Sequence, residues 1–400
     1  MKLVDKVIKI LIFIMTFCFI YYFTIRDSGG YPYVQSLVDY EHGFVRRGLW
    51  GALGNVFGSY PFSYEKYMMA MDFLYVGLGG LVIILFATVE YRRNQNNNGL
   101  FIYLMLILTS PFFIKNFVSD KGRLDVIGAA LITLLALISL LNFPRLIIIF
   151  ASLFTVVISL FGDNIFVLYG IPMLLISYVS AQERSVAKAW ALLPAVAFIV
   201  SFSINFFAHP PVTSMGEFNN YLQSKTLDKI TFESIAPLYK TGSDFIQFNY
   251  DPSNRITDNL TKDGFLGFWL LLILNLGVIL AVLKDSIALR NFDQGEKLLL
   301  VLSFTFGAIL LVETTDWIRF LSNFIFWISI LCVRYSGRWN VNYSNFNSAS
   351  VYKVLIVFQL LFPASMGIGV WYPWSAHIEF RMDPGVRPEY DISDLINFIR

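Results

Sequence analysis

Charged residues are scarce in this 400-residue sequence. Asp, Glu, Lys and Arg make up 14% of it, compared with roughly 25% in an ordinary soluble protein. Hydrophobic residues make up 56%, and they gather in long runs that leave no stretch with the composition of a soluble domain. A run of about 18 apolar residues is long enough to cross a lipid bilayer. The composition therefore indicates an integral membrane protein, with the lipid bilayer as its first partner and no nucleic acid expected.

Cysteine and histidine are also rare. The two cysteines, Cys18 and Cys332, lie in apolar runs, which excludes a soluble disulfide framework and predicts a packing role. Three histidines are spread over the whole chain, so a histidine-based metal site is not expected. The Gly-rich phosphate loop of the Walker kind, the HExxH motif and the Gly-x-Ser-x-Gly elbow are all absent. Nothing in the sequence therefore points to the enzyme classes that these motifs mark.

Eleven apolar segments are candidates for membrane-spanning helices. They are 8–25, 68–89, 99–115, 124–141, 146–161, 165–180, 189–208, 264–283, 298–313, 317–333 and 352–371. The first has a basic start but no clear small-residue cleavage site, so we expect a retained helix and not a cleaved signal peptide. The expected fold class is all-α. Residues 1–400 form a single integral membrane domain, a polytopic helix bundle of about 11 transmembrane helices.

Basic residues in the short connections predict the orientation of this bundle. With eleven spans, most of them fall on one side, at Lys2, Lys6, Lys9, Arg92, Arg93, Arg145, Arg184, Lys188, Lys284, Arg290, Lys297, Arg334, Arg338 and Lys353. That side is expected to be the cytoplasm, so the N-terminus is cytoplasmic and the C-terminus extracytoplasmic. Six of the 28 acidic residues share that side, namely Asp5, Glu90, Glu183, Asp285, Asp293 and Glu296. The outer face is therefore acidic.

The long connections all fall on the outer side. They are a first external loop at 26–67, a large external loop at 209–263 and a C-terminal tail at 372–400. The large external loop is too long for a plain tether, and short helices are expected in it around 215–224 and 231–240. Functional residues tend to lie in loops that a rigid scaffold positions. The work of this protein is therefore expected at its outer face.

The first external loop concentrates ionisable residues in the stretch VDYEHGFVRRGLWG, residues 38–51. They are Asp39, Glu41, His42, Arg46 and Arg47. Apolar residues recur at helical spacing over 44–57, which predicts an amphipathic helix at the membrane interface. Its glycines permit close packing against neighbouring spans. One interpretation is a solvated interfacial helix whose arginines bind lipid phosphates and whose acids pair with those arginines.

Three further connections bring charged residues to the same outer rim. The residues are Lys115, Asp120, Lys121, Arg123 and Asp125 before the fourth expected span, Asp163 after the fifth, and Glu313, Asp316 and Arg319 between the ninth and tenth. Each connection taken singly fits a turn, a cap or a local ion pair. Ionisable residues at membrane depth are costly and usually functional. The set therefore predicts one composite polar site at the outer boundary of the membrane.

Basic residues grouped near acids at this boundary suit a phosphorylated lipid. Guanidinium groups match phosphate oxygens bidentately. A nearby carboxylate is suited to deprotonate an incoming hydroxyl as a general base. Alternatively, the same carboxylate is suited to bind a divalent metal ion that bridges a pyrophosphate. No nucleotide pool exists outside the cytoplasm, so a donor there has to arrive already activated on a lipid. These properties predict glycosyl transfer from a polyprenyl-linked saccharide donor to a glycan acceptor.

The chain resembles two groups of membrane glycosyltransferases. Acids ahead of an interfacial helix in the first external loop, here Asp39 and Glu41 before residues 44–57, resemble the GT-C superfamily. The resemblance implies that one of the two acids is the catalytic base or a metal ligand. The 39 Phe and 21 Tyr, the large external loop and the scattered external arginines resemble the O-antigen and repeat-unit polymerases of the Wzy type. That resemblance implies pyrophosphate binding by Arg46, Arg47 and Arg123, in a multi-pass protein of the bacterial inner membrane.

Two other function classes remain open at this point. A transporter or flippase of lipid-linked saccharide would place its substrate site near the bilayer midplane, at helices broken by Gly or Pro, and Pro172 and Pro194 lie within expected spans. A non-enzymatic assembly protein would not require charged residues from several connections to converge. The remaining residues of the predicted site, His42, Lys121, Asp125, Glu313, Asp316 and Arg319, are assigned to substrate binding.

Overall fold

The computed structural model describes thirteen helices and no strand within the residues it covers. Those residues are 2–24, 30–41, 48–56, 63–93, 98–110, 113, 124–141, 143–183, 190, 192–207, 214–228, 230, 273, 276–278, 292–313, 317–339, 343, 346 and 350–361. The helices are α1 (Lys2–Thr24), α2 (Gly30–Ser36), α3 (Leu49–Val56), α4 (Tyr64–Arg93), α5 (Asn98–Leu108), α7 (Asp125–Ser139), α8 (Pro144–Phe161), α9 (Asp163–Glu183), α10 (Leu192–Phe207), α11 (Met215–Ser224), α16 (Gln294–Glu313), α17 (Trp317–Arg334) and α19 (Ser350–Leu361). The predicted all-α class is confirmed for this part of the chain.

Ten of the eleven apolar segments coincide, at least in part, with one of these helices. The eleventh, 264–283, lies almost wholly outside the described residues. Three helical stretches are long and apolar enough to cross a membrane: Tyr64–Arg92, Pro144–Phe161 and Ile165–Gln182. Shorter apolar helices run over Asn98–Leu108, Asp125–Ser139, Leu192–Ile204 and Phe320–Arg334. The chain thus contains membrane-spanning candidates, while the count of eleven crossings stays a prediction.

The outward faces of the bundle are apolar. On α1, Val4, Leu11 and Met15 are exposed, and on α10 Val196 and Ile199 are exposed. A helix that is apolar on its outer face as well as its inner one is typical of a lipid surrounding. The exposed side chains therefore agree with the membrane character that the composition indicates.

Helix α17 lies at the centre of the bundle and contacts α4, α5, α7, α9 and α16. Buried hydrogen bonds fasten it to its neighbours: the Tyr103 hydroxyl of α5 donates to Ser329 at 3.0 Å, and the Tyr169 hydroxyl of α9 donates to Asn323 at 2.5 Å. Polar side chains inside an apolar bundle act as such interhelical contacts because lipid offers them no alternative partner. They fix the rotation of α17 relative to α5 and α9.

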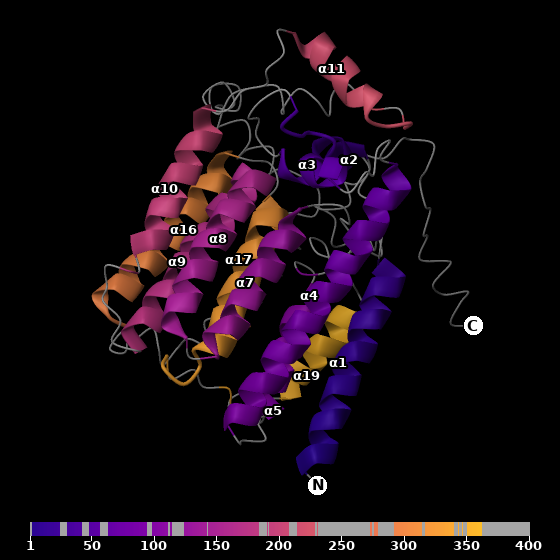
Figure 1. Cartoon of the computed structure of the whole chain (residues 1–400). Helices are drawn as coiled ribbons and strands as arrows, with labels where there is room; N and C mark the ends of the chain where they lie inside the picture. The colour runs from indigo at the N-terminus through magenta and orange to yellow at the C-terminus, as the bar shows by residue number, and fades with distance from the viewer. Residues whose placement is uncertain are drawn as a thin grey trace, which may run out of the picture.

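The two ends of the bundle differ in their polar contacts. Figure 1 shows α2, α3 and α11 gathered at one end and the N-terminus at the other. At the N-terminal end, Lys9 contacts Glu90 at 3.3 Å, and the Arg338 guanidinium contacts Glu296 at 2.5 Å. These basic residues belong to the set that predicts the cytoplasmic side. The opposite end carries the described residues of the connection expected to be external, 30–41, 48–56 and 63–67, and the candidate site lies there.

Candidate functional site

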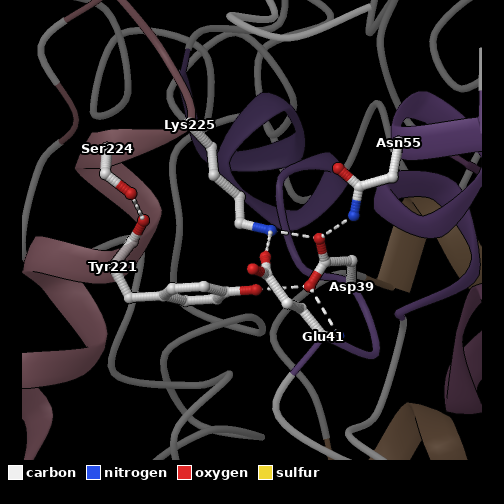
Figure 2. A network of polar contacts seen from close by, with 6 residues as sticks. All are labelled: Asp39, Glu41, Asn55, Tyr221, Ser224 and Lys225. Carbon is white, nitrogen blue, oxygen red and sulfur yellow. Dashed lines mark hydrogen bonds and ion pairs between the residues drawn. The ribbon is translucent and has the colours of Figure 1, made fainter. Parts of the chain in front are cut away.

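Asp39 is buried at the centre of a polar cluster at the α2–α3 end of the bundle (Figure 2). Its carboxylate accepts hydrogen bonds from the Lys225 ammonium, the Tyr221 hydroxyl and the Asn55 amide, and from the backbone N–H of Glu41 at 3.1 Å. Lys225 is nearly as buried as Asp39. A buried charge is costly unless it is paired and hydrogen-bonded. Both charges meet that condition here.

The local sequence accounts for the position of Asp39. Helix α2 ends where the Ser36 hydroxyl donates to the Tyr33 carbonyl at 2.6 Å, and the chain then runs without helix to Glu41. A bond from the N–H of residue i+2 to an Asp side chain is an Asx turn, and the contact from Glu41 N–H to Asp39 is of this kind. Asp39 therefore has its carboxylate held by its own backbone before any distant residue contributes.

Helix α3 lies directly on the backbone that precedes Asp39. A Cβ atom added at Gly51 would lie 2.3 Å from the Val38 carbonyl oxygen, so only glycine permits this approach. Asn55 follows Gly51 by four residues and therefore shares its face of the helix. The close packing at Gly51 brings the Asn55 amide to Asp39. The predicted interfacial helix is described only from Leu49 onward.

Helix α11 contributes Tyr221, and Lys225 follows it directly. Ser214 caps the helix by accepting from Glu217 N–H at 3.2 Å, and Ser followed three residues later by Glu is a capping-box sequence. Tyr221 and Lys225 are four residues apart and so lie on one face, with the ammonium 4.4 Å from the centre of the tyrosine ring. The helix expected around 215–224 is confirmed, while 231–240 lies outside the described residues.

Glu41 differs from Asp39 in its access to solvent. Its carboxylate contacts Lys225 Nζ at 3.1 Å, yet its side chain is 57% exposed, whereas that of Asp39 is 0% exposed. One ammonium thus bridges two carboxylates, of which one is enclosed and one is open. Only the open carboxylate has room for a reacting group.

The environment of Asp39 lowers its pKa. Burial alone would raise the pKa because it penalises the charged form, but the hydrogen bonds from Lys225, Tyr221 and the Glu41 amide lower it, and the Lys225 charge adds to them. The net pKa lies below the ordinary value for Asp. Asp39 is therefore a carboxylate at neutral pH and a weak proton acceptor, which suits an anchoring group better than a general base.

A divalent cation shared by Asp39 and Glu41 does not fit this arrangement. The Lys225 ammonium already contacts both carboxylates, and Asp39 accepts three further hydrogen bonds. Across the part of the chain that the structure describes, no group of three or more His, Cys, Asp or Glu residues is placed to hold a metal ion. Glu41 alone offers a single carboxylate ligand.

Most of the other predicted site residues cannot be compared with this cluster. His42, Arg46, Arg47, Lys121, Arg123 and Asp316 lie outside the described residues. Glu313 ends α16 and Arg319 lies in the first turn of α17, but the described structure does not include their side chains. Asp125 is buried at the start of α7, and it is not among the hydrogen-bond partners of Asp39 described above. The structure therefore brings together Asp39 and Glu41 from the predicted set.

Sequence reasoning missed three members of the cluster: Asn55, Tyr221 and Lys225. One signal was available for Lys225. A lysine in an expected external loop runs against the positive-inside trend, and the same criterion selected Lys121 and Arg123. Tyr221 and Lys225 also have the i, i+4 spacing of one helix face. Neither signal identifies Asp39 as the partner of Tyr221 and Lys225.

Comparison with family models, curated proteins and solved structures finds no match for this chain. The resemblance to the GT-C superfamily and to Wzy-type polymerases accordingly stays a prediction.

Proposed function

We propose that this chain is a multi-pass membrane glycosyltransferase or polysaccharide polymerase of the bacterial inner membrane. It transfers sugar from a polyprenyl-(pyro)phosphate-linked donor to a glycan acceptor at the extracytoplasmic face. The observation that carries the proposal is the paired carboxylate cluster of the first external loop, in which Glu41 is open to solvent and Asp39 is enclosed.

In this proposal the two acids have different roles. Glu41 is the general base that takes the proton of the acceptor hydroxyl as the new glycosidic bond forms, because its carboxylate is accessible. Asp39 anchors the loop, because its carboxylate is saturated with donors and its pKa is lowered. Arg46, Arg47, Lys121 and Arg123 supply the positive charge for the donor phosphate.

The helix geometry supports surface chemistry over the transporter alternative. A transporter site at the bilayer midplane is typically built from interrupted helices. Here α9 runs without a break from Asp163 to Glu183 although Pro172 lies inside it. Pro194 lies in the first turn of α10, where proline is tolerated. Neither proline therefore interrupts its helix. The charge cluster joins Asp39 to residues of α3 and of the α11 segment, and these helices lie at one end of the bundle (Figure 1).

The proposed orientation is tested by reporter fusions. Basic residues at one end of the bundle predict that a reporter fused after Arg93 lies in the cytoplasm, because cytoplasmic loops carry the excess of Lys and Arg. A reporter fused at residue 240 is expected outside. The measurement pairs alkaline phosphatase with green fluorescent protein at each position. A cytoplasmic signal at residue 240 would put the Asp39 cluster on the wrong side for a lipid-linked donor.

The proposed reaction is tested with purified protein in nanodiscs. We expect it to transfer saccharide from a synthetic polyprenyl-pyrophosphate donor to a glycan acceptor and to release the polyprenyl pyrophosphate. The products are followed by mass spectrometry, with Glu41→Gln as the inactive control. Movement of intact donor across a sealed vesicle, without any new glycosidic bond, would instead favour a flippase.

A further inference from the structure

Residues 214–228 and 230, here called the strap, contact the α2–α4 end of the bundle at two places. The first is the contact of Tyr221 and Lys225 with Asp39 and Glu41. At the second, Asp228 accepts hydrogen bonds from Tyr64 N–H at 2.7 Å and from the Tyr33 hydroxyl at 3.2 Å. Tyr33 also bonds the Thr226 hydroxyl. The strap residues at both places fall in one stretch of eight residues, 221–228.

The strap is held in shape by hydrogen bonds among its own residues. Ser214 caps its helix, and the Gln223 side chain donates to the Asp228 carbonyl at 2.8 Å and accepts from Ile230 N–H at 3.2 Å. Two apolar side chains of its helix, Phe218 and Leu222, are buried. Because its turn is held by its own side chains, the strap is expected to dock as a unit.

Of the two places, breaking the Lys225–Asp39 ion pair is expected to weaken docking of the strap the most. The second fastening joins hydroxyl and backbone groups to Asp228. At the first, two charges with little solvent access face each other, Lys225 with 7% and Asp39 with 0% of the side chain exposed. Removing one member of a buried ion pair leaves an uncompensated charge, which is more disruptive than removing both.

We propose that Lys225 is a positioning residue for this site: its ammonium docks the strap onto Asp39 and thereby holds the Glu41 carboxylate in its working orientation. The docking role stands on the geometry alone. The role toward Glu41 rests on the proposed function, because it assumes that Glu41 acts on an acceptor hydroxyl. Lys225 contacts Glu41 and acts through it.

Docking is measured by the labelling rate of two neighbouring cysteine reporters. Thr226 is 5% exposed and Leu227 is 83% exposed, so Thr226→Cys reports docking and Leu227→Cys is the matched control. Both are made with Cys18→Ala, since Cys18 is exposed whereas Cys332 is buried. In the parent, a membrane-impermeant maleimide should label Thr226→Cys far more slowly than Leu227→Cys. Equal rates in the parent would overturn the docked strap.

Three variants separate charge from position. Lys225→Met should raise the labelling rate of Thr226→Cys by roughly tenfold or more, because it leaves the buried Asp39 carboxylate without its counter-charge. Lys225→Arg should keep labelling slow, because it keeps the charge. The double variant Asp39→Asn with Lys225→Met should also label slowly, because neither charge remains. If Lys225→Met labels as slowly as the parent, Lys225 does not dock the strap.

Sugar transfer by the same variants tests the role toward Glu41. The double variant should dock the strap and still transfer sugar about tenfold more slowly than the parent, mainly through a lower kcat, because Glu41 has lost its ammonium partner. Normal kcat in the double variant would show that Lys225 only neutralises Asp39 and would overturn the positioning role. If the parent transfers no sugar at all, the proposed function fails, while the labelling rates still decide whether Lys225 docks the strap.

Discussion

Glu41→Gln is expected to reduce sugar transfer by about 100-fold or more, the usual contribution of a general base. Glutamine has nearly the shape of glutamate and can still accept a hydrogen bond from Lys225, but it cannot take a proton from the acceptor. The side chain is 57% exposed, so the variant should unfold at nearly the parent temperature. The measurement is product formed per minute at matched amounts of folded protein in nanodiscs.

Two other acids serve as controls for Glu41→Gln. Asp39→Asn should lower thermal stability, because removing one partner of a buried pair costs on the order of 3–5 kcal/mol, and transfer should fall with it, because Lys225 docks on Asp39 and also contacts Glu41. Glu65→Gln, at an exposed position in the first turn of α4, should leave both transfer and stability nearly unchanged, because an exposed charge contributes little to stability. Near-normal transfer by Glu41→Gln would exclude Glu41 as the base and would leave the first external loop as an interfacial anchor.

Gly51→Ala is expected to destabilise the protein by on the order of 3 kcal/mol, at the upper end for an overpacked core. The added Cβ would lie 2.3 Å from the Val38 carbonyl oxygen and 2.7 Å from its carbon. These are backbone atoms that cannot rotate away, so α3 has to shift. Asn55 would move with α3, and Asp39 follows Val38 directly, so transfer should fall together with stability. The measurement is the thermal unfolding temperature in detergent, compared with transfer by the folded fraction.

Gly77→Ala is the matched control for Gly51→Ala. Gly77 also lies within a helix, α4, but among the described residues no atom other than those of its chain neighbours and its own helix backbone lies within 4 Å of where its Cβ would be. Alanine is a better helix former than glycine by up to about 1 kcal/mol, so this variant should be as stable as the parent or slightly more stable. If the two alanine variants behave alike, the close approach of α3 to Val38 is not required for the fold.

Hydropathy predicted the positions of the helices well, because each one is marked by a local run of apolar residues. The apolar segment 146–161 became α8, which starts at Pro144, and 165–180 became α9. The short helix near 215–224 could be predicted for a similar reason, since Ser214 and Glu217 form a local cap. The predicted helix at 44–57 is described from Leu49 to Val56. Asp39 could be selected as a candidate catalytic acid from its charge beside an apolar helix, and the structure places it at the centre of a polar cluster in which its role is proposed to be anchoring.

The sequence by itself determined that this is a helical chain with membrane-spanning candidates, because in lipid every backbone polar group has to be satisfied within its own segment and apolar length is therefore readable locally. It also determined that acids gather in the first external loop. Only the tertiary structure decided which of those acids is enclosed. Asp39 pairs with Lys225, 186 residues away, and Gly51 is needed because another backbone lies against it. Such partners come from packing between elements distant in the chain, and one sequence carries no local signal of which distant residues will meet.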